Sequence, residues 1–187
     1  MAQGKLACLL GSGFEDSEFR VPYDRLRKEG YQVDIVGPKA GQELKGYKGM
    51  ETVKADKGID EVRPEDYVGL LIPGGQSPDH LRADQRFVDF VKRFDSLKRP
   101  LAAVCHGPQL LLSARLVRGR TLTAWSTVQG DLQQAGANVK DEQVVIDQNW
   151  ITSRKPDDLQ AFGDAMIDSL RKAERAAADG EVRAQPR

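Results

Sequence analysis

Several features are scarce in this sequence of 187 residues, and each scarcity excludes a class of protein. The longest unbroken apolar runs, such as residues 6–10, fall far short of the about 20 apolar residues that a membrane-spanning helix needs. No leader with an apolar core and a cleavage site opens the chain, so we expect a cytoplasmic protein with no membrane partner. Because Lys plus Arg (28) equals Asp plus Glu (28), no net positive charge attracts phosphates, and no nucleic-acid partner is expected.

Cysteine and histidine are equally scarce, with two residues of each type. Cys8 and Cys105 lie far apart in a chain of ordinary size, which favours two free thiols over a disulfide. The cysteines and histidines do not have the spacing of a structural zinc site, and no Walker-type phosphate loop occurs. We therefore expect neither a metal nor a cofactor.

The length fits a single domain. Residues 1–171 contain enough apolar positions for one core, and we expect them to form one α/β domain. Residues 172–187 are charged and rich in alanine, with too few apolar side chains to pack along their whole length. This segment is therefore predicted to be a partly disordered tail.

Short apolar runs alternate with amphipathic stretches along the chain. Strands are predicted at 5–10, 32–36, 68–72, 101–104, 121–124, 144–147 and 150–153, with a small hairpin within 41–60. Helices are predicted near 19–26, 77–97, 108–112 and 128–134, and from 157 to about 170 or somewhat beyond. The alternation predicts a flavodoxin-like, doubly wound and mostly parallel sheet flanked by helices, in which ligands collect at the carboxyl ends of the strands.

Cys105 is the sharpest candidate for a functional residue, because it lies where a buried strand turns into a helix. A thiol at that place faces the positive end of the helix, which is expected to lower its pKa and favour the thiolate. The competing interpretation is a small buried residue at a crowded packing position. For Cys8, which lies inside the first predicted strand, that inert interpretation is the preferred one.

A nucleophilic cysteine usually needs a base within hydrogen-bond reach. His106 follows Cys105 directly, and neighbouring side chains diverge on a regular helix, so the two can meet only in an irregular turn. His80 lies in the first turn of an earlier helix and is predicted to be a surface residue, although it could line the same edge of the sheet.

Other strand ends carry polar groups that could assist a thiolate. Glu15 follows the first strand and, if burial keeps it protonated, can donate a hydrogen bond to the sulfur. Asp79 could orient a histidine, and the backbone N–H groups of Gly74, Gly75 and His106 could form an oxyanion hole. Acids that stabilise helix dipoles and an ordinary glycine turn would explain the same residues.

Three motifs together resemble the ThiJ/PfpI family, in its intracellular protease and general stress protein branch. They are Gly13-Phe-Glu15-Asp16-Ser-Glu18, Leu71-Ile-Pro73-Gly74-Gly75 and Ala103-Val-Cys105-His106-Gly107-Pro108. The resemblance runs from the first strand to the last helix and implies a class I glutamine amidotransferase-like fold. It also implies that Cys105 is the nucleophile, that His106 is its partner and that Glu15 contacts the thiol. An acid matching Asp79 would reach the histidine of a neighbouring subunit, which implies a homodimer or larger assembly.

The resemblance implies a stress-protective, cysteine-dependent hydrolase. The preferred activity is that of a protein deglycase or glyoxalase acting on small carbonyl adducts of glyoxal or methylglyoxal, with Cys105 as nucleophile and His106 as proton shuttle. An intracellular peptidase acting on peptides is one alternative, and a redox sensor or chaperone that works through oxidation of Cys105 is another. A glutamine amidotransferase is excluded, because its triad needs a histidine well downstream and none follows His106.

Overall fold

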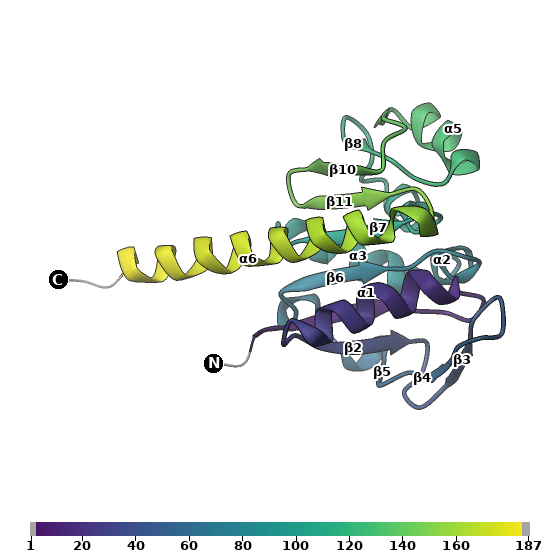
Figure 1. Cartoon of the computed structure of the whole chain (residues 1–187), viewed down its shortest axis with the longest axis horizontal. Coiled ribbons are helices and arrows are strands. Elements are labelled where there is room, and N and C mark those ends of the chain that lie inside the picture. The colour runs from purple at the N-terminus through teal and green to yellow at the C-terminus, as the bar shows by residue number, and fades with distance from the viewer. Residues whose placement is uncertain (1–2, 185–187) are drawn as a thin grey trace.

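The computed structural model describes residues 3–184, and a seven-stranded sheet forms its centre (Figure 1). All its strand pairs are parallel except the antiparallel pair of β10 with β11. The predicted doubly wound, mostly parallel sheet is thereby confirmed. In spatial order the strands are β10 (Val144–Asp147), β11 (Trp150–Ser153), β7 (Leu101–Val104), β6 (Gly69–Ile72), β1 (Lys5–Leu9), β2 (Gln32–Gly37) and β5 (Lys57–Gly58).

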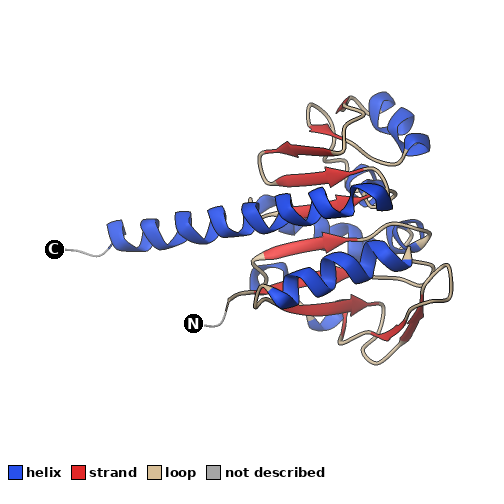
Figure 2. Cartoon of the chain, in the orientation of Figure 1, coloured by secondary structure: helices blue, strands red, loops and turns tan. Residues whose placement is uncertain are grey.

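Helices cover both faces of this sheet (Figure 2). The side chains of β1 explain the two layers, because they alternate between two apolar clusters. Leu6 and Cys8 belong to the cluster built with α1 (Asp16–Lys28) and α6 (Leu159–Ala184). Ala7 and Leu9 belong to the cluster built with α3 (Gln85–Ser96) and α4 (Pro108–Ser113). The helices are α1 (Asp16–Lys28), α2 (Ser77–Arg82), α3 (Gln85–Ser96), α4 (Pro108–Ser113), α5 (Ser126–Gln134) and α6 (Leu159–Ala184).

Two small sheets lie outside the central one. The predicted hairpin is present as the antiparallel pair β3 (Glu43–Lys45) and β4 (Thr52–Lys54). The strand predicted at 121–124 is shorter and does not join the main sheet, since β8 (Thr121–Leu122) pairs with β9 (Asn138–Val139) instead. Three short 3-10 helices complete the described elements, at Ile59–Glu61, Pro64–Asp66 and Pro156–Asp158.

The helix predicted at 77–97 is two helices in the structure. The first ends at Arg82, and the side chain of Asp84 accepts a hydrogen bond of 3.1 Å from the N–H of Arg86. An aspartate in this position caps the start of a new helix, which stops the first helix from continuing. The break leaves α2 as a short helix beside the carboxyl ends of the strands.

The last helix is longer than predicted, because α6 continues from Leu159 through Ala184 with no boundary at 172. Alanine, glutamate, lysine and arginine dominate the extension, and these are strong helix formers that need little packing. A salt bridge from Arg171 to Glu29 ties the helix to the end of α1. Beyond that point α6 projects away from the body of the domain (Figure 1). Residues 185–187 of the predicted tail lie outside the described part. Within residues 3–184, no helix combines the length and apolar character required to traverse a bilayer.

The strand order fixes where a ligand site can form. From β1 the chain first adds β2 on one side and later adds β6 and β7 on the other, so the order reverses between β1 and β6. Crevices at such a reversal lie outside the carboxyl ends of the strands. The segments that follow β1, β6 and β7 therefore meet at one edge of the sheet.

Candidate active site

The turn after β7 holds Cys105 in a left-handed backbone conformation, with φ of 62°. Few residues other than glycine adopt this conformation, and it is often associated with function. The N–H of Cys105 donates to the carbonyl of Ser153 at 3.0 Å, and its carbonyl accepts from the N–H of Trp125 at 2.9 Å. Only glycine fits at position 107, since a Cβ there would lie 2.6 Å from the carbonyl oxygen of Ile72. The backbone on both sides thus fixes the sharp turn that presents the thiol.

This irregular turn brings the side chains of Cys105 and His106 together, with Sγ and Nδ1 3.3 Å apart. The imidazole also stacks on Trp125, with ring centroids 6.2 Å apart and an angle of 26° between the planes. Burial lowers the pKa of His106, and the charge of Asp79 offsets part of this effect. At neutral pH the imidazole is therefore mainly uncharged and able to accept a proton from the thiol.

The acid beside the thiol is Glu18, which sequence reasoning missed. Its carboxyl is fully buried, accepts a hydrogen bond of 3.0 Å from the N–H of Gly74 and lies within hydrogen-bonding reach of the Cys105 thiol. Burial, followed by the charge of Glu15, raises the pKa of Glu18 to about 8. This carboxyl is therefore mostly protonated at neutral pH. The sequence feature that could have identified Glu18 is its position next to Phe19, on the core-facing side of the first helix.

The predicted contact between Glu15 and the thiol is wrong. Glu15 caps the start of α1, where its Oε2 accepts from the N–H of Glu18 at 2.9 Å, and its Oε1 lies 2.9 Å from the ammonium of Lys48. Burial works to raise the pKa of Glu15, but hydrogen bonds from Lys48, Ser17 and the Glu18 N–H outweigh burial and hold the pKa below its usual range. Glu15 is thus a charged carboxylate one helical turn away from the acid that meets the sulfur.

The expectation of an intrinsically acidic thiol is also wrong. Burial, followed by the charge of ionised Glu18, raises the pKa of Cys105, while hydrogen bonds from the N–H groups of His106 and Gly75 lower it. Only 6% of the surface of Cys105 is exposed, so the loss of hydration outweighs the two backbone donors. The resting residue is therefore a thiol, and its activation depends on the base and the acid beside it.

The two predicted glycines have different places at the site. The N–H groups of Gly75 and His106 point at the sulfur of Cys105, and their use as an oxyanion hole stays a prediction. The N–H of Gly74 is occupied by Glu18. A Cβ on Gly74 would lie 2.8 Å from the Cβ of Cys105, so the thiol and the acid can approach each other only because this residue is glycine.

Asp79 and His80 lie at the rim of the site, on α2. Asp79 is largely exposed and pairs with Arg82, with 2.6 Å between Oδ1 and Nη2. The Nδ1 of His80 lies 2.9 Å from the carbonyl oxygen of Ser12, which can only accept, so Nδ1 is the donor in this contact. Since the structure describes one chain, the reach of Asp79 to the histidine of a neighbouring subunit stays a prediction.

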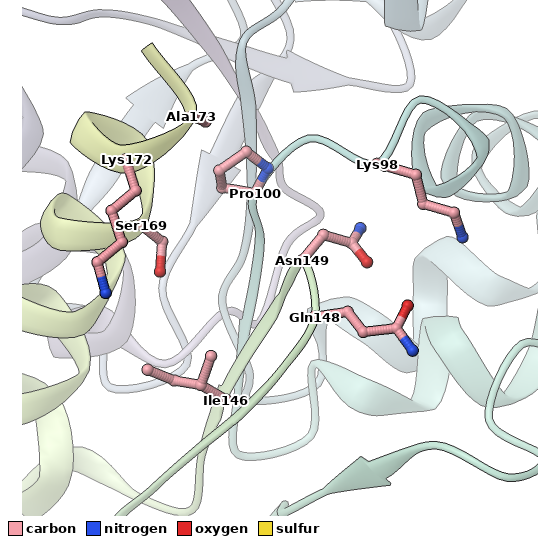
Figure 3. Close-up of a pocket in the computed structure, with 8 residues that line it drawn as sticks. All are labelled: Lys98, Pro100, Ile146, Gln148, Asn149, Ser169, Lys172 and Ala173. Carbon is pink, nitrogen blue, oxygen red and sulfur yellow. The ribbon is translucent and has the colours of Figure 1, made fainter. Parts of the chain in front are cut away.

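These residues line one open pocket of about 880 Å³. Its other lining residues include Tyr47, Lys48, Gln76, Gln109, Trp125 and Pro156. A second pocket, of about 550 Å³, lies by the amino ends of β7 and β11 (Figure 3). Its lining residues are Lys98, Pro100, Ile146, Gln148, Asn149, Ser169, Lys172 and Ala173. That set contains no thiol, imidazole or carboxyl group, so the machinery for nucleophilic chemistry is gathered in the first pocket.

The fold and the site together define a class of protein: an α/β domain with a cysteine in a strained turn between a strand and a helix, and an imidazole beside it. Residues 4–169 match the DJ-1/PfpI family, and the chain belongs to that family. One relative is "Protein/nucleic acid deglycase 2" of Escherichia coli, 50% identical over 84% of this chain and 92% of its own length. Another is "General stress protein 18" of Bacillus subtilis, 43% identical over 90% of this chain and 98% of its own length.

Solved structures agree on the fold. A two-domain protein from Anabaena variabilis with DJ-1/ThiJ/PfpI-like and ferritin-like domains superposes with a TM-score of 0.88 and 36% identity. The match covers 90% of this chain and 48% of that protein. Drosophila melanogaster DJ-1beta superposes with a TM-score of 0.83 over 96% of this chain and 98% of its own, at 23% identity. At that identity the likeness speaks for the fold alone.

Proposed function

We propose that this chain is a cysteine-dependent hydrolase of the deglycase type, which removes glyoxal- or methylglyoxal-derived groups from amines. The observation that carries the proposal is the 3.3 Å approach of the Cys105 thiol to a mainly uncharged His106 at the floor of an open pocket. A thiol, an adjacent base and a protonated acid are the groups that addition to a carbonyl carbon requires. The relative at 50% identity carries a deglycase name, which supports the same activity.

The chemistry assigns one task to each side chain. His106 takes the proton of the Cys105 thiol at Nδ1 while the sulfur forms a bond to the carbonyl carbon, and the carbonyl electron pair moves to its oxygen. Protonated Glu18 donates to the sulfur as negative charge develops there, together with the N–H of Gly75. The imidazolium then protonates the amine as the bond between nitrogen and the neighbouring carbinol carbon breaks, while the hydroxyl of that carbon gives its proton to the oxyanion and becomes a carbonyl. His106 takes the remaining hydroxyl proton and returns it to the sulfur as the bond between carbon and sulfur breaks, which frees the thiol and releases the dicarbonyl for hydration by water.

The shape of the site favours a small substrate group over a folded polypeptide. The pocket is open, but only 6% of the surface of Cys105 is accessible at its floor, so the group that meets the sulfur must be narrow. Two- and three-carbon dicarbonyl adducts meet this condition. Peptidase activity is the second candidate, because the charge of Asp79 supports the imidazolium of His106 as the acid of a Cys-His-Asp arrangement would.

The test is release of free amine from N-acetyl-lysine or a short peptide that has been glycated with methylglyoxal. Cys105→Ser is expected to lower the rate by at least about 10³-fold, because the hydroxyl is a far weaker nucleophile. The matched control is Cys8→Ser, which changes the other cysteine and should retain the activity. Equal rates in the wild type and Cys105→Ser would defeat the proposal, and cleavage of casein by the wild type without amine release would favour the peptidase.

We also propose that the protein works in the cytoplasm as a homodimer or larger assembly. The exposed carboxylate of Asp79, at the rim of the pocket, is available to a second copy. Light scattering after gel filtration measures the mass, and the 20.7 kDa of one chain is the outcome that would contradict the assembly.

A further inference from the structure

The loop between β3 and β4 is anchored to the start of α1 by one buried carboxylate. Asp16 accepts hydrogen bonds from the N–H groups of Lys48, Met50 and Glu51, at 2.8, 2.9 and 2.8 Å. The anchored loop is tight, because a Cβ on Gly46 would overlap the carboxylate of Asp16. The backbone of Lys48 is therefore held in place although its side chain is half exposed.

From this anchored position Lys48 starts a line of groups that ends at the thiol. Its ammonium lies 2.9 Å from Oε1 of Glu15, and Oε2 of Glu15 accepts from the N–H of Glu18 at 2.9 Å. The carboxyl of Glu18 in turn lies beside Cys105, because a Cβ on Gly74 would crowd both Oε1 of Glu18 and the Cβ of Cys105. An ammonium, a carboxylate, a protonated carboxyl and a thiol thus follow one another from the surface to the buried sulfur.

The charges in this line act on one another. The carboxylate of Glu15 disfavours a second negative charge on Glu18, and the ammonium of Lys48 favours it. The other ionisable groups that line the pocket are His106, next to the thiol, Asp79 and His80 at the rim, and the phenol of Tyr47 beside Lys48. Among the ionisable groups that line the pocket, only Lys48 has a side chain that is permanently positive at neutral pH.

We propose that Lys48 is a positioning residue for the nucleophile: by balancing the charge of Glu15, it sets the protonation of Glu18 and, through it, the ionisation of Cys105. This role rests on the proposed function for its use in catalysis, but it concerns the thiol itself and is measurable without turnover. Lys48 touches neither the sulfur nor the acid that contacts it in this arrangement. Its ammonium acts on Glu18 by its own charge and by offsetting the charge of Glu15, which it contacts.

The test follows the rate of alkylation of Cys105 by iodoacetamide as a function of pH, measured on the Cys105 peptide by mass spectrometry. In Lys48→Gln the uncompensated charge of Glu15 should disfavour loss of a proton from Glu18 and from Cys105. The pH midpoint of the alkylation rate is therefore expected to rise by about 0.5 to 1 pH unit. Lys48→Arg keeps the charge and should restore the wild-type midpoint. Glu15→Gln removes the carboxylate and should move the midpoint downward.

Lys45→Gln is the matched control, since Lys45 lies on the same hairpin with its side chain exposed and paired with Glu43. An unchanged midpoint in Lys48→Gln, an equal shift in Lys45→Gln, or a uniform loss of rate at every pH would each overturn the proposal. Amine release by the wild type is measured in parallel. A shifted midpoint without any amine release would refute the proposed function alone, and amine release without a shift would refute the role of Lys48 alone.

Discussion

The two cysteines show how the same side chain behaves in two regions of one sheet. Cys8 lies inside β1, in register with Ile35 on one side and Leu71 on the other, and is fully buried. Cys105 lies just past the end of β7, where the chain turns and a pocket opens. Both thiols have a pKa that burial raises above the ordinary value. Burial therefore does not separate the reactive cysteine from the inert one.

The difference lies in the polar groups that surround the sulfur. In the middle of a strand the backbone N–H and carbonyl groups are committed to the neighbouring strands, so none is aimed at Cys8. At the strand end the N–H groups of Gly75 and His106 point at the sulfur of Cys105, and a base and an acid stand beside it. Position at the edge of a parallel sheet supplies these partners.

The largest contrast is expected in alkylation of the folded protein by iodoacetamide. Cys105 should react through the pocket, whereas Cys8 should react only when the sheet opens, at a rate lower by at least about 10³-fold. Peptide mapping after timed quenching measures both rates in one sample. Comparable labelling of the two cysteines in native protein would contradict the difference in reactivity between Cys105 and Cys8.

A smaller effect is expected from Glu18→Gln on the pH dependence of stability. The pKa of Glu18 is raised from 4.5 to about 8, so between these values the folded protein binds a proton that the unfolded chain has released. The free energy of unfolding of the wild type therefore falls as pH rises through this window. Glutamine does not titrate, so the variant should lack a decrease on the order of a few kcal/mol.

Urea unfolding at pH 5, 6, 7 and 8 measures this difference, and Glu15→Gln is the control. Glu15 has a lowered pKa, so the stability it contributes is present above its ordinary value of 4.5 and is lost only as pH falls below that value. Because the charge of Glu15 also raises the pKa of Glu18, its variant should keep a decrease in stability between pH 5 and 8, but a smaller one than the wild type shows. Parallel curves for the wild type and Glu18→Gln would show that Glu18 is already ionised at neutral pH.

The smallest effect is expected from Cys8→Ala. Removal of one buried sulfur leaves a small cavity between β1 and the apolar cluster of α1 and α6, which costs about 1 kcal/mol. Amine release should be unchanged, because the side chain lies in the interior of the strand. Loss of activity at full stability would mean that Cys8 contributes to the chemistry.

Most of the sheet could be predicted from the sequence, because its strands are short apolar runs that end in glycine or proline. The turn at Cys105 was also predictable, since the helix-starting Pro108 comes only three residues after the cysteine that follows the strand. The short strand β9 was not, because Asn138 and Val139 carry no alternating pattern of their own. The predicted end of α6 was too early, because the segment after it has few apolar residues, although alanine-rich helices need little packing to form.

The candidate site was predictable in position but not in its electrostatics. Sequence placed Cys105, His106 and Gly75 at one edge of the sheet, and the structure brings these three together. The prediction of Glu15 as the acid beside the thiol was wrong, because the N-cap Glu15 and the helical residue Glu18 are separated by one turn, and only the packed helix shows that Glu18 faces the sulfur. The predicted lowering of the thiol pKa was wrong because this pKa depends on how deeply the sulfur is buried. That depth is a property of the packed chain, and no local sequence pattern reports it.

The direction of α6 has a practical consequence. The helix runs antiparallel to the strands and carries the C-terminal end of the described chain away from the end of the sheet where the thiol lies (Figure 1). A purification tag or a fluorescent fusion joined there would hang from a rigid rod on the far side of the domain. Immobilisation through that rod would orient every molecule with its pocket facing the solution, which suits surface-based measurements of adduct capture.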